Sequence, residues 1–152
     1  MNEYQLILAE ENGTVANFEA KIIKQYEQEN RVGRGGIWLK LAKQYYEDKL
    51  LLSKYPYPED FNAIYSDKTP PVIKEIFRNN TIEPLYRWGR QYGITGNHRI
   101  LYTIHNYHRI VLLHYFNKQY NGDIKTNDIE KAESVYMDYC AIDPSFYPYW
   151  KG

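Results

Sequence analysis

The sequence lacks several features that would assign it to a particular protein class. Its single cysteine, Cys140, excludes an internal disulfide and a zinc site built from cysteines. No apolar run approaches the roughly 18 residues that a membrane-spanning helix needs. The first residues, MNEYQLILAEENG, carry acidic side chains where a secretory signal would carry basic ones. We therefore expect a cytoplasmic protein, of a kind that a bacterium or a phage would encode.

Net charge is also absent, since 19 Lys and Arg balance 19 Asp and Glu. A neutral chain is not suited to bulk electrostatic capture of nucleic acid. The charges are unevenly spread, however, because residues 85–125 carry an excess of basic side chains with Asp123 as their one acid, and all four histidines lie in the same stretch. This distribution predicts a local basic, histidine-bearing face on an otherwise acidic body.

Aromatic residues, by contrast, are abundant: they make up 16% of the 152 residues, and 17 of them are tyrosines. Tyrosine combines a large apolar area with a hydroxyl that needs a partner, so a tyrosine-rich rim of the core is the simplest interpretation. The length fits one domain over 1–152, large enough to bury a core.

The N-terminal third predicts a strand followed by two helices. Residues 4–9 form a short apolar run before a turn-like Glu-Asn-Gly, which is typical of a strand. Apolar residues at helical spacing then predict an amphipathic helix over 14–31, with Thr14 as a plausible N-cap. After three glycines, a second helix is expected over 37–53.

The middle of the chain has no clear periodicity. Residues 54–71 contain four prolines and are expected to be irregular, whereas 72–80 is expected to form a short helix. A connection of this length is unusual in a compact domain, so we interpret 54–80 as an insertion.

From residue 85 onward the pattern predicts three strands. They cover 85–93, 98–104 and 109–116, and Asn106–Tyr107 forms a tight connection between the last two. Because 109–116 is almost wholly apolar, we expect this strand in the middle of a sheet.

A final helix is expected from about Asn127 to Cys140. The aromatic tail over 141–152 either packs over a groove or is disordered. The predicted fold is therefore α+β: a small antiparallel sheet, made of the N-terminal strand and a three-strand meander, packed with two N-terminal helices and a C-terminal helix.

Residues 85–139 resemble the RelE/ParE superfamily of small bacterial toxins, and within it the HigB-like, phage-derived branch. The resemblance rests on the segments LYRWGRQYG, HRILYTI, RIVLLHYFNK and IEKAESVYMDY, which cover about the last third of the chain. The chain departs from the family pattern at Tyr115, where a small residue is common, at Gln119, where a second basic residue is common, and after Lys125–Thr126, where a proline is missing.

The resemblance implies a toxin of a type II toxin–antitoxin system, neutralised by an antitoxin protein that covers the sheet face or wraps the helices. Relatives of the RelE and HigB kind cut mRNA, commonly on the ribosome, whereas those of the ParE kind act on DNA gyrase. Three functions stay open: an mRNA endoribonuclease, a toxin that binds a protein target such as gyrase, and an inactive phage or mobile-element protein that serves as a binding module.

RNA cleavage of the RelE kind needs neither metal nor cofactor. The ribose 2′-OH attacks the adjacent phosphate, so the protein must promote loss of the hydroxyl proton and stabilise charge on the phosphate. The resemblance places Arg99 at the family's arginine position, where a guanidinium can bind phosphate oxygens. It places Lys118 at the basic position after the central strand, for charge stabilisation or proton transfer. His114 could exchange protons near neutral pH, although its apolar surroundings equally fit a hydrogen-bonded core histidine.

Six further residues are candidates for binding RNA. Arg87 and Arg90 are separated by an odd number of positions on one strand, so we expect them on opposite faces, with Arg90 as the weaker candidate. His98 flanks Arg99 and could act as acid or base. Stacking on bases by Tyr92 and Tyr120, and charge from Lys125, complete the set.

The other two histidines, His105 and His108, are interpreted as turn residues. They lie three positions apart without a nearby carboxylate, which is a weak metal signal, and we expect no metal site.

Overall fold

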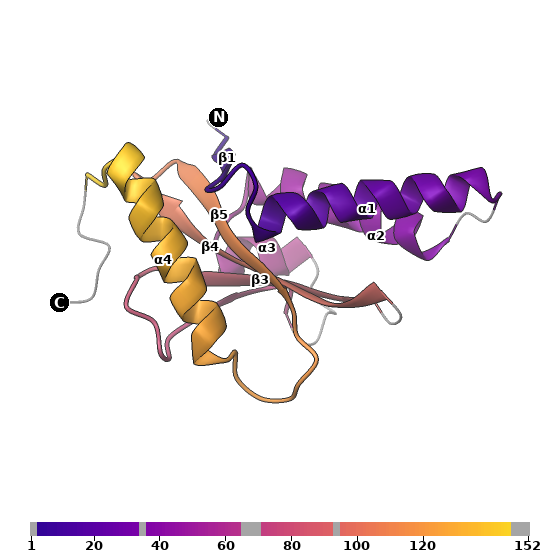
Figure 1. Cartoon of the computed structure of the whole chain (residues 1–152). Helices are drawn as coiled ribbons and strands as arrows, with labels where there is room; N and C mark the ends of the chain where they lie inside the picture. Colours follow the sequence, from indigo (N-terminus) through magenta and orange to yellow (C-terminus); the bar gives the residue numbers. More distant parts are fainter. Residues whose placement is uncertain (1–2, 34–35, 65–70, 93–94, 147–152) are drawn as a thin grey trace.

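The protein folds into an α+β structure, which a computed structural model describes for residues 3–33, 36–64, 71–92 and 95–146 (Figure 1). Within these ranges the chain forms four helices and five strands. In chain order they are β1 (Gln5–Leu8), α1 (Thr14–Arg31), α2 (Ile37–Leu52), α3 (Pro58–Ile64), β2 (Ile73–Glu75), β3 (Tyr86–Tyr92), β4 (Gly96–His105), β5 (Arg109–Asn117) and α4 (Thr126–Ile142).

The strands form one sheet in the order β1-β5-β4-β3-β2. The predicted α+β class is confirmed, and so is the position of β5 inside the sheet. The expectation of a wholly antiparallel sheet is wrong, because β1 runs parallel to β5, with Gln5 opposite Arg109 and Leu8 opposite Leu112. Parallel pairing requires a crossover, and the intervening helices and strands provide it.

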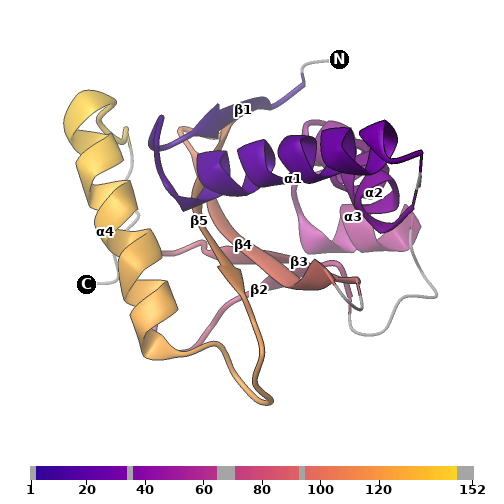
Figure 2. The ribbon, with the colours of Figure 1, turned by 45° about the vertical axis from the view of Figure 1, so that its right-hand side comes forward.

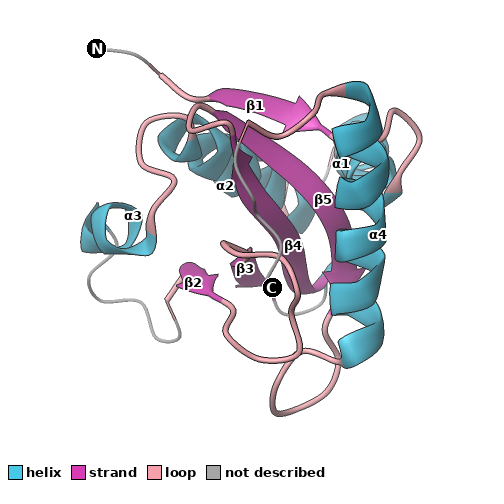
Figure 3. Cartoon of the chain, turned by 90° about the vertical axis from the view of Figure 1, so that its left-hand side faces the viewer, coloured by secondary structure: helices cyan, strands magenta, loops and turns pink. Residues whose placement is uncertain are grey.

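Helices cover the two faces of the sheet unequally. Helices α1, α2 and α3 lie over one face and α4 lies over the other (Figures 2 and 3). Side chains alternate along β4 and contribute to the apolar clusters on both faces of the sheet. Ile100 and Tyr102 pack under α1 and α2, and Leu101 packs under α4. Side chains on the α4 face that lie beyond the start of that helix are therefore left without a helical cover.

The middle region is part of the core and the sheet. The helix predicted over 72–80 is wrong: Ile73–Glu75 pair with β3 as strand β2, and Ile73 is fully buried. The irregular stretch predicted over 54–71 includes α3, whose Phe61 is also fully buried. In this region, pairing with a neighbouring strand and burial in the core determined the secondary structure, and the weak local sequence pattern did not.

The β4–β5 connection has the predicted tight geometry. Asn106 and Tyr107 both adopt positive φ angles, 50° and 66°, as a tight hairpin turn requires. The Asn106 side chain also donates to the carbonyl of Pro144 and accepts from the amide of Phe146, so the first part of the aromatic tail packs against this turn. Residues 147–152 of the tail lie outside the described residues.

Thr14 does not cap α1 as predicted. Its hydroxyl accepts the Tyr115 N–H (2.8 Å) and contacts His114 Nδ1 (3.1 Å), which ties the start of α1 to β5. The final helix α4 begins at Thr126, one residue before the predicted start, and the Asp128 side chain bonds to His114. No described helix is both long enough and apolar enough to cross a membrane.

Candidate anion-binding site

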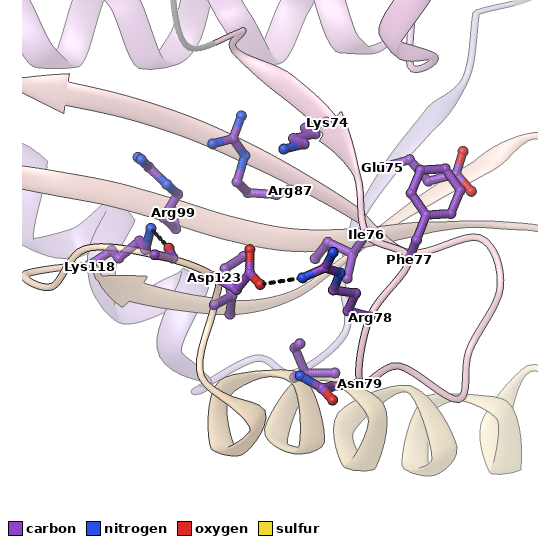
Figure 4. Close-up of a pocket in the computed structure, with 13 residues that line it drawn as sticks. Lys74, Glu75, Ile76, Phe77, Arg78, Asn79, Arg87, Arg99, Lys118 and Asp123 are labelled. Carbon is purple, nitrogen blue, oxygen red and sulfur yellow. Dashed lines mark hydrogen bonds and ion pairs between the residues drawn. The ribbon is translucent and has the colours of Figure 1, made fainter.

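A cavity of about 330 Å³ opens on the α4 face of the sheet, beside the start of that helix (Figure 4). Its walls come from β2 and the loop after it, from β3 and β4, and from the loop between β5 and α4. Basic side chains outnumber acidic ones. The charged lining residues are Lys74, Arg78, Arg87, Arg99 and Lys118, against Glu75 and Asp123.

Two arginines form the floor of this pocket. The register of β3 and β4 places Arg99 opposite Gly89 and Arg87 opposite Leu101, so both side chains project from neighbouring strands on the same face. Arg99 crosses the bare backbone of β3, because a Cβ atom on Gly89 would lie only 2.8 Å from Arg99 Nη1 and 2.9 Å from its Cδ. The absence of a side chain at position 89 therefore shapes the pocket floor.

The charges on these arginines are not neutralised by the protein. Arg87 and Arg99 are only 8% and 6% exposed. Their hydrogen bonds go to neutral groups: Arg87 donates to the carbonyl of Pro71, and Arg99 donates to the side chain of Asn97 and the carbonyl of His98. The Nε of each is buried without a partner, and within the described ranges no carboxylate pairs with either guanidinium. An anion in the pocket would supply both the missing charge and the missing acceptors.

The cationic groups also repel one another. Burial, and then the charge of Arg99, lower the pKa of Arg87 to about 10, and burial lowers the pKa of Arg99. Burial followed by the charges of Arg99 and Arg87 lowers the pKa of Lys118. Arginine stays protonated at neutral pH in any case. A bound anion would relieve this repulsion, so the site is prepared for negative charge.

The loop after β5 contributes a further cation of the pocket, Lys118, and an aromatic ring. Lys118 Nζ donates to the carbonyl of Gly122 and lies 5.4 Å from the centre of the Tyr120 ring. Lys125 Nζ lies 4.6 Å from the same ring, but Lys125 does not line the pocket. At the mouth, exposed Arg78 and Asp123 form an ion pair (3.2 Å) that joins this loop to the one after β2.

Arg90 lies on the other face of the sheet, as the odd separation from Arg87 predicts. Its guanidinium makes a two-point contact with the fully buried carboxylate of Asp48 on α2, at 2.8 Å and 2.7 Å. Trp88 Nε1 donates to the same carboxylate at 3.1 Å. The structure thus places Arg90 in the core beneath α2 and not in the pocket.

None of the histidines lines the pocket. His98 lies on the α1 face because it neighbours Arg99 on a strand, and it contacts Tyr115 Oη (2.8 Å) and Thr95 Oγ1 (3.1 Å). His114 is buried in contact with Asp128 (2.9 Å) as well as Thr14, which is the core arrangement considered from the sequence.

The remaining sequence candidates lie elsewhere. The prediction of a turn position is wrong for His105: it is the last residue of β4, fully buried, and contacts Tyr136 Oη at 2.7 Å. His108 does lie in the turn. The side chain of Tyr92 is outside the described residues.

Three further lining residues were not predicted from the sequence: Lys74, Phe77 and Arg78. They belong to the region interpreted as an insertion with a short helix. The signal that could have found them is strand pairing, since Lys74 lies directly opposite Arg87 on the pocket face.

Comparison with known proteins adds no assignment. No protein-family model matches the chain, and no curated protein matches it.

The placement of His98 has a consequence for acid stability. Burial, with smaller contributions from Lys21 and Arg99, lowers its pKa from 6.5 to about 4, so the folded protein holds a neutral imidazole while the unfolded chain protonates below pH 6.5. Stability from this residue is thus present above pH 6.5 and lost as the pH falls toward 4, by up to about 3 kcal/mol. Urea unfolding at pH 7 and pH 5 should show a smaller loss for His98→Gln than for wild type. Equal losses would contradict this assignment.

Proposed function

We propose that this protein is the toxin of a type II toxin–antitoxin system, of the RelE/ParE superfamily and HigB-like, which cleaves mRNA in the cytoplasm without a metal ion. The observation that carries the proposal is the pair of buried arginines, Arg87 and Arg99, which lack any carboxylate partner in the described chain. The chain order of a strand, helices, antiparallel strands and a final helix also fits the resemblance, with α3 and β2 as additional elements between α2 and β3.

In this mechanism the scissile phosphate binds across Arg87 and Arg99. The 2′-OH attacks phosphorus, the bond to the 5′-oxygen breaks, and the products end in a 2′,3′-cyclic phosphate and a 5′-OH. Negative charge grows on the phosphate oxygens in the transition state, where the fixed, water-poor guanidinium groups stabilise it most. One proton passes from the 2′-OH to water, and the Lys118 ammonium gives one to the leaving 5′-oxygen.

Lys118 is the residue we assign to proton transfer. It lines the same pocket as both arginines, and its lowered pKa brings it closer to the range in which an amine can exchange protons. No histidine lines the pocket, which leaves Lys118 without a competing imidazole there. The partners of the protein would be mRNA, the ribosome where cleavage depends on translation, and an antitoxin, through which oligomers could assemble.

The function is tested by inducing the protein in a bacterial host, following growth, and mapping the 5′ ends of a reporter mRNA. Growth arrest with new 5′ ends inside translated codons is the expected result. Arrest without new ends would instead favour a protein target such as gyrase, and absence of arrest would favour an inactive binding protein.

Lys118→Arg sharpens this test. The variant keeps the positive charge but cannot release a proton near neutral pH. We expect it to retain RNA binding and to lose growth arrest and new 5′ ends, whereas a purely electrostatic role would leave most of the activity intact.

A further inference from the structure

The pocket has two chemically different parts. Its cationic part comprises Arg87, Arg99 and Lys118, and its apolar part comprises Ile76, Phe77, Ile124 and Ile129. Figure 4 places Phe77 and Lys118 at opposite ends. A ligand that fits both parts must combine an anionic group with an apolar one.

Phe77 stands out among the apolar side chains of the lining. It is 69% exposed, and of the large apolar side chains that are exposed in the described chain, it alone lines this pocket. An open aromatic face in the same pocket as unneutralised cations is the arrangement that binds single-stranded nucleic acid, since the ring stacks on a base and the cations hold the backbone.

The loop that carries Phe77 is fixed at both ends. Next to the ring, the Ile76 N–H donates to the carbonyl of Leu85 (2.8 Å). Further along, the half-exposed loop is held to α4, because the buried Glu133 carboxylate accepts the backbone N–H groups of Thr81 and Ile82. The exposed position of Phe77 is thus set by the fold, so little ordering is needed when a base stacks on it.

We propose that Phe77 is the stacking platform for an unpaired nucleobase of a single-stranded RNA whose phosphate binds Arg87 and Arg99. This inference rests on the proposed function and adds the form of the substrate. A paired base in a duplex is already stacked on its neighbours and cannot offer a free face to the ring. The site therefore selects single-stranded RNA and contacts at least one of its bases.

The test uses a short single-stranded oligonucleotide with 2′-fluoro sugars, which has no 2′-OH and cannot be cut. One base is 2-aminopurine, whose fluorescence is quenched on stacking. Wild type should quench this base, with the label moved along the strand to find the position. Phe77→Leu, which keeps apolar volume but loses the ring, should abolish quenching and weaken binding about 5- to 100-fold at fixed salt. Phe77→Tyr, which keeps a ring, should behave like wild type.

A strand that lacks the base but keeps the phosphates distinguishes the contribution of base stacking to binding from that of the phosphate contacts. Wild type should bind it about as weakly as Phe77→Leu binds the intact strand. If wild type binds intact and abasic strands equally and Phe77→Leu changes nothing, the stacking inference fails while the anion site stands. If wild type binds no strand, or if Arg99→Ala binds as tightly as wild type, the proposed function itself fails.

Discussion

Arg99→Ala is expected to lower RNA cleavage by about 100-fold or more while leaving the protein at least as stable to heat as wild type. Both effects have one cause. The guanidinium is 6% exposed, has a buried Nε without a partner, and lies in the same pocket as Arg87 and Lys118. Its removal deletes transition-state stabilisation and also relieves repulsion between buried cations. The measurements are single-turnover cleavage of single-stranded RNA and thermal unfolding.

Two matched variants separate position from charge. Arg78→Ala removes the same charge from the pocket mouth, but the Arg78 side chain is 81% exposed and paired with Asp123, so we expect at most about a fivefold loss of cleavage. Gly89→Ala changes no charge, yet its methyl would displace the Arg99 side chain. We expect its cleavage rate to lie between the rates of Arg99→Ala and Arg78→Ala.

An equal loss of RNA cleavage in Arg99→Ala and Arg78→Ala would contradict the assignment of Arg99. Equal loss would mean that only net charge near the surface matters. A large drop in melting temperature for Arg99→Ala would also contradict it, because it would reveal a structural role for the side chain.

Asp48→Ala is expected to destabilise the fold by about 3–5 kcal/mol, which corresponds to a melting temperature lower by roughly 6–20 °C. The Asp48 carboxylate is fully buried and accepts hydrogen bonds from Arg90, Trp88 and Gln44. Its loss removes the carboxylate that accepts hydrogen bonds from the Arg90 guanidinium and the Trp88 N–H inside the protein. Urea denaturation measures the change in the free energy of unfolding.

A double variant identifies the cause. Asp48→Leu combined with Arg90→Met removes both charges and fills much of the space, so it should recover most of the lost stability. Because Arg90 lies on the face of the sheet opposite the pocket, we expect it to have no role in RNA binding. The double variant should therefore cleave RNA like wild type. A double variant as unstable as Asp48→Ala would show that loss of the Asp48–Arg90 ion pair is not the main cause.

Much of the fold follows from local pattern. The helices over 14–31 and 37–53 and the strands of the meander were predicted within a few residues, because long amphipathic and β-branched segments have one favourable arrangement. The three-residue strand at Ile73 was not, since a segment this short carries no period and is stabilised by its pairing with β3 and by hydrogen bonds to Asn62, both distant in sequence or unpredicted. The parallel pairing of β1 depends on the whole topology, which no local signal contains.

For the site, alternation correctly separated Arg87 from Arg90. It could not place His114, because a β-bulge between β4 and β5 shifts the register after Leu101. The shift turns His114 toward Asp128 on α4, whereas simple alternation from Leu112 would place it under α1. Basic residues in the middle region went unnoticed since their role depends on β2, an element that the sequence did not predict.

The pairing of β1 with β5 also constrains how the protein is made. Its first strand and first two helices leave the ribosome well before residues 109–117, whose strand lies between β1 and β4. At about 5–20 residues per second, the apolar sides of Phe18, Ile22 and Leu41 wait roughly 5–20 s for the sheet that buries them. The pocket is completed only when residues 118–129 emerge, so a nascent chain carries an uncovered apolar face long before it can bind an anion.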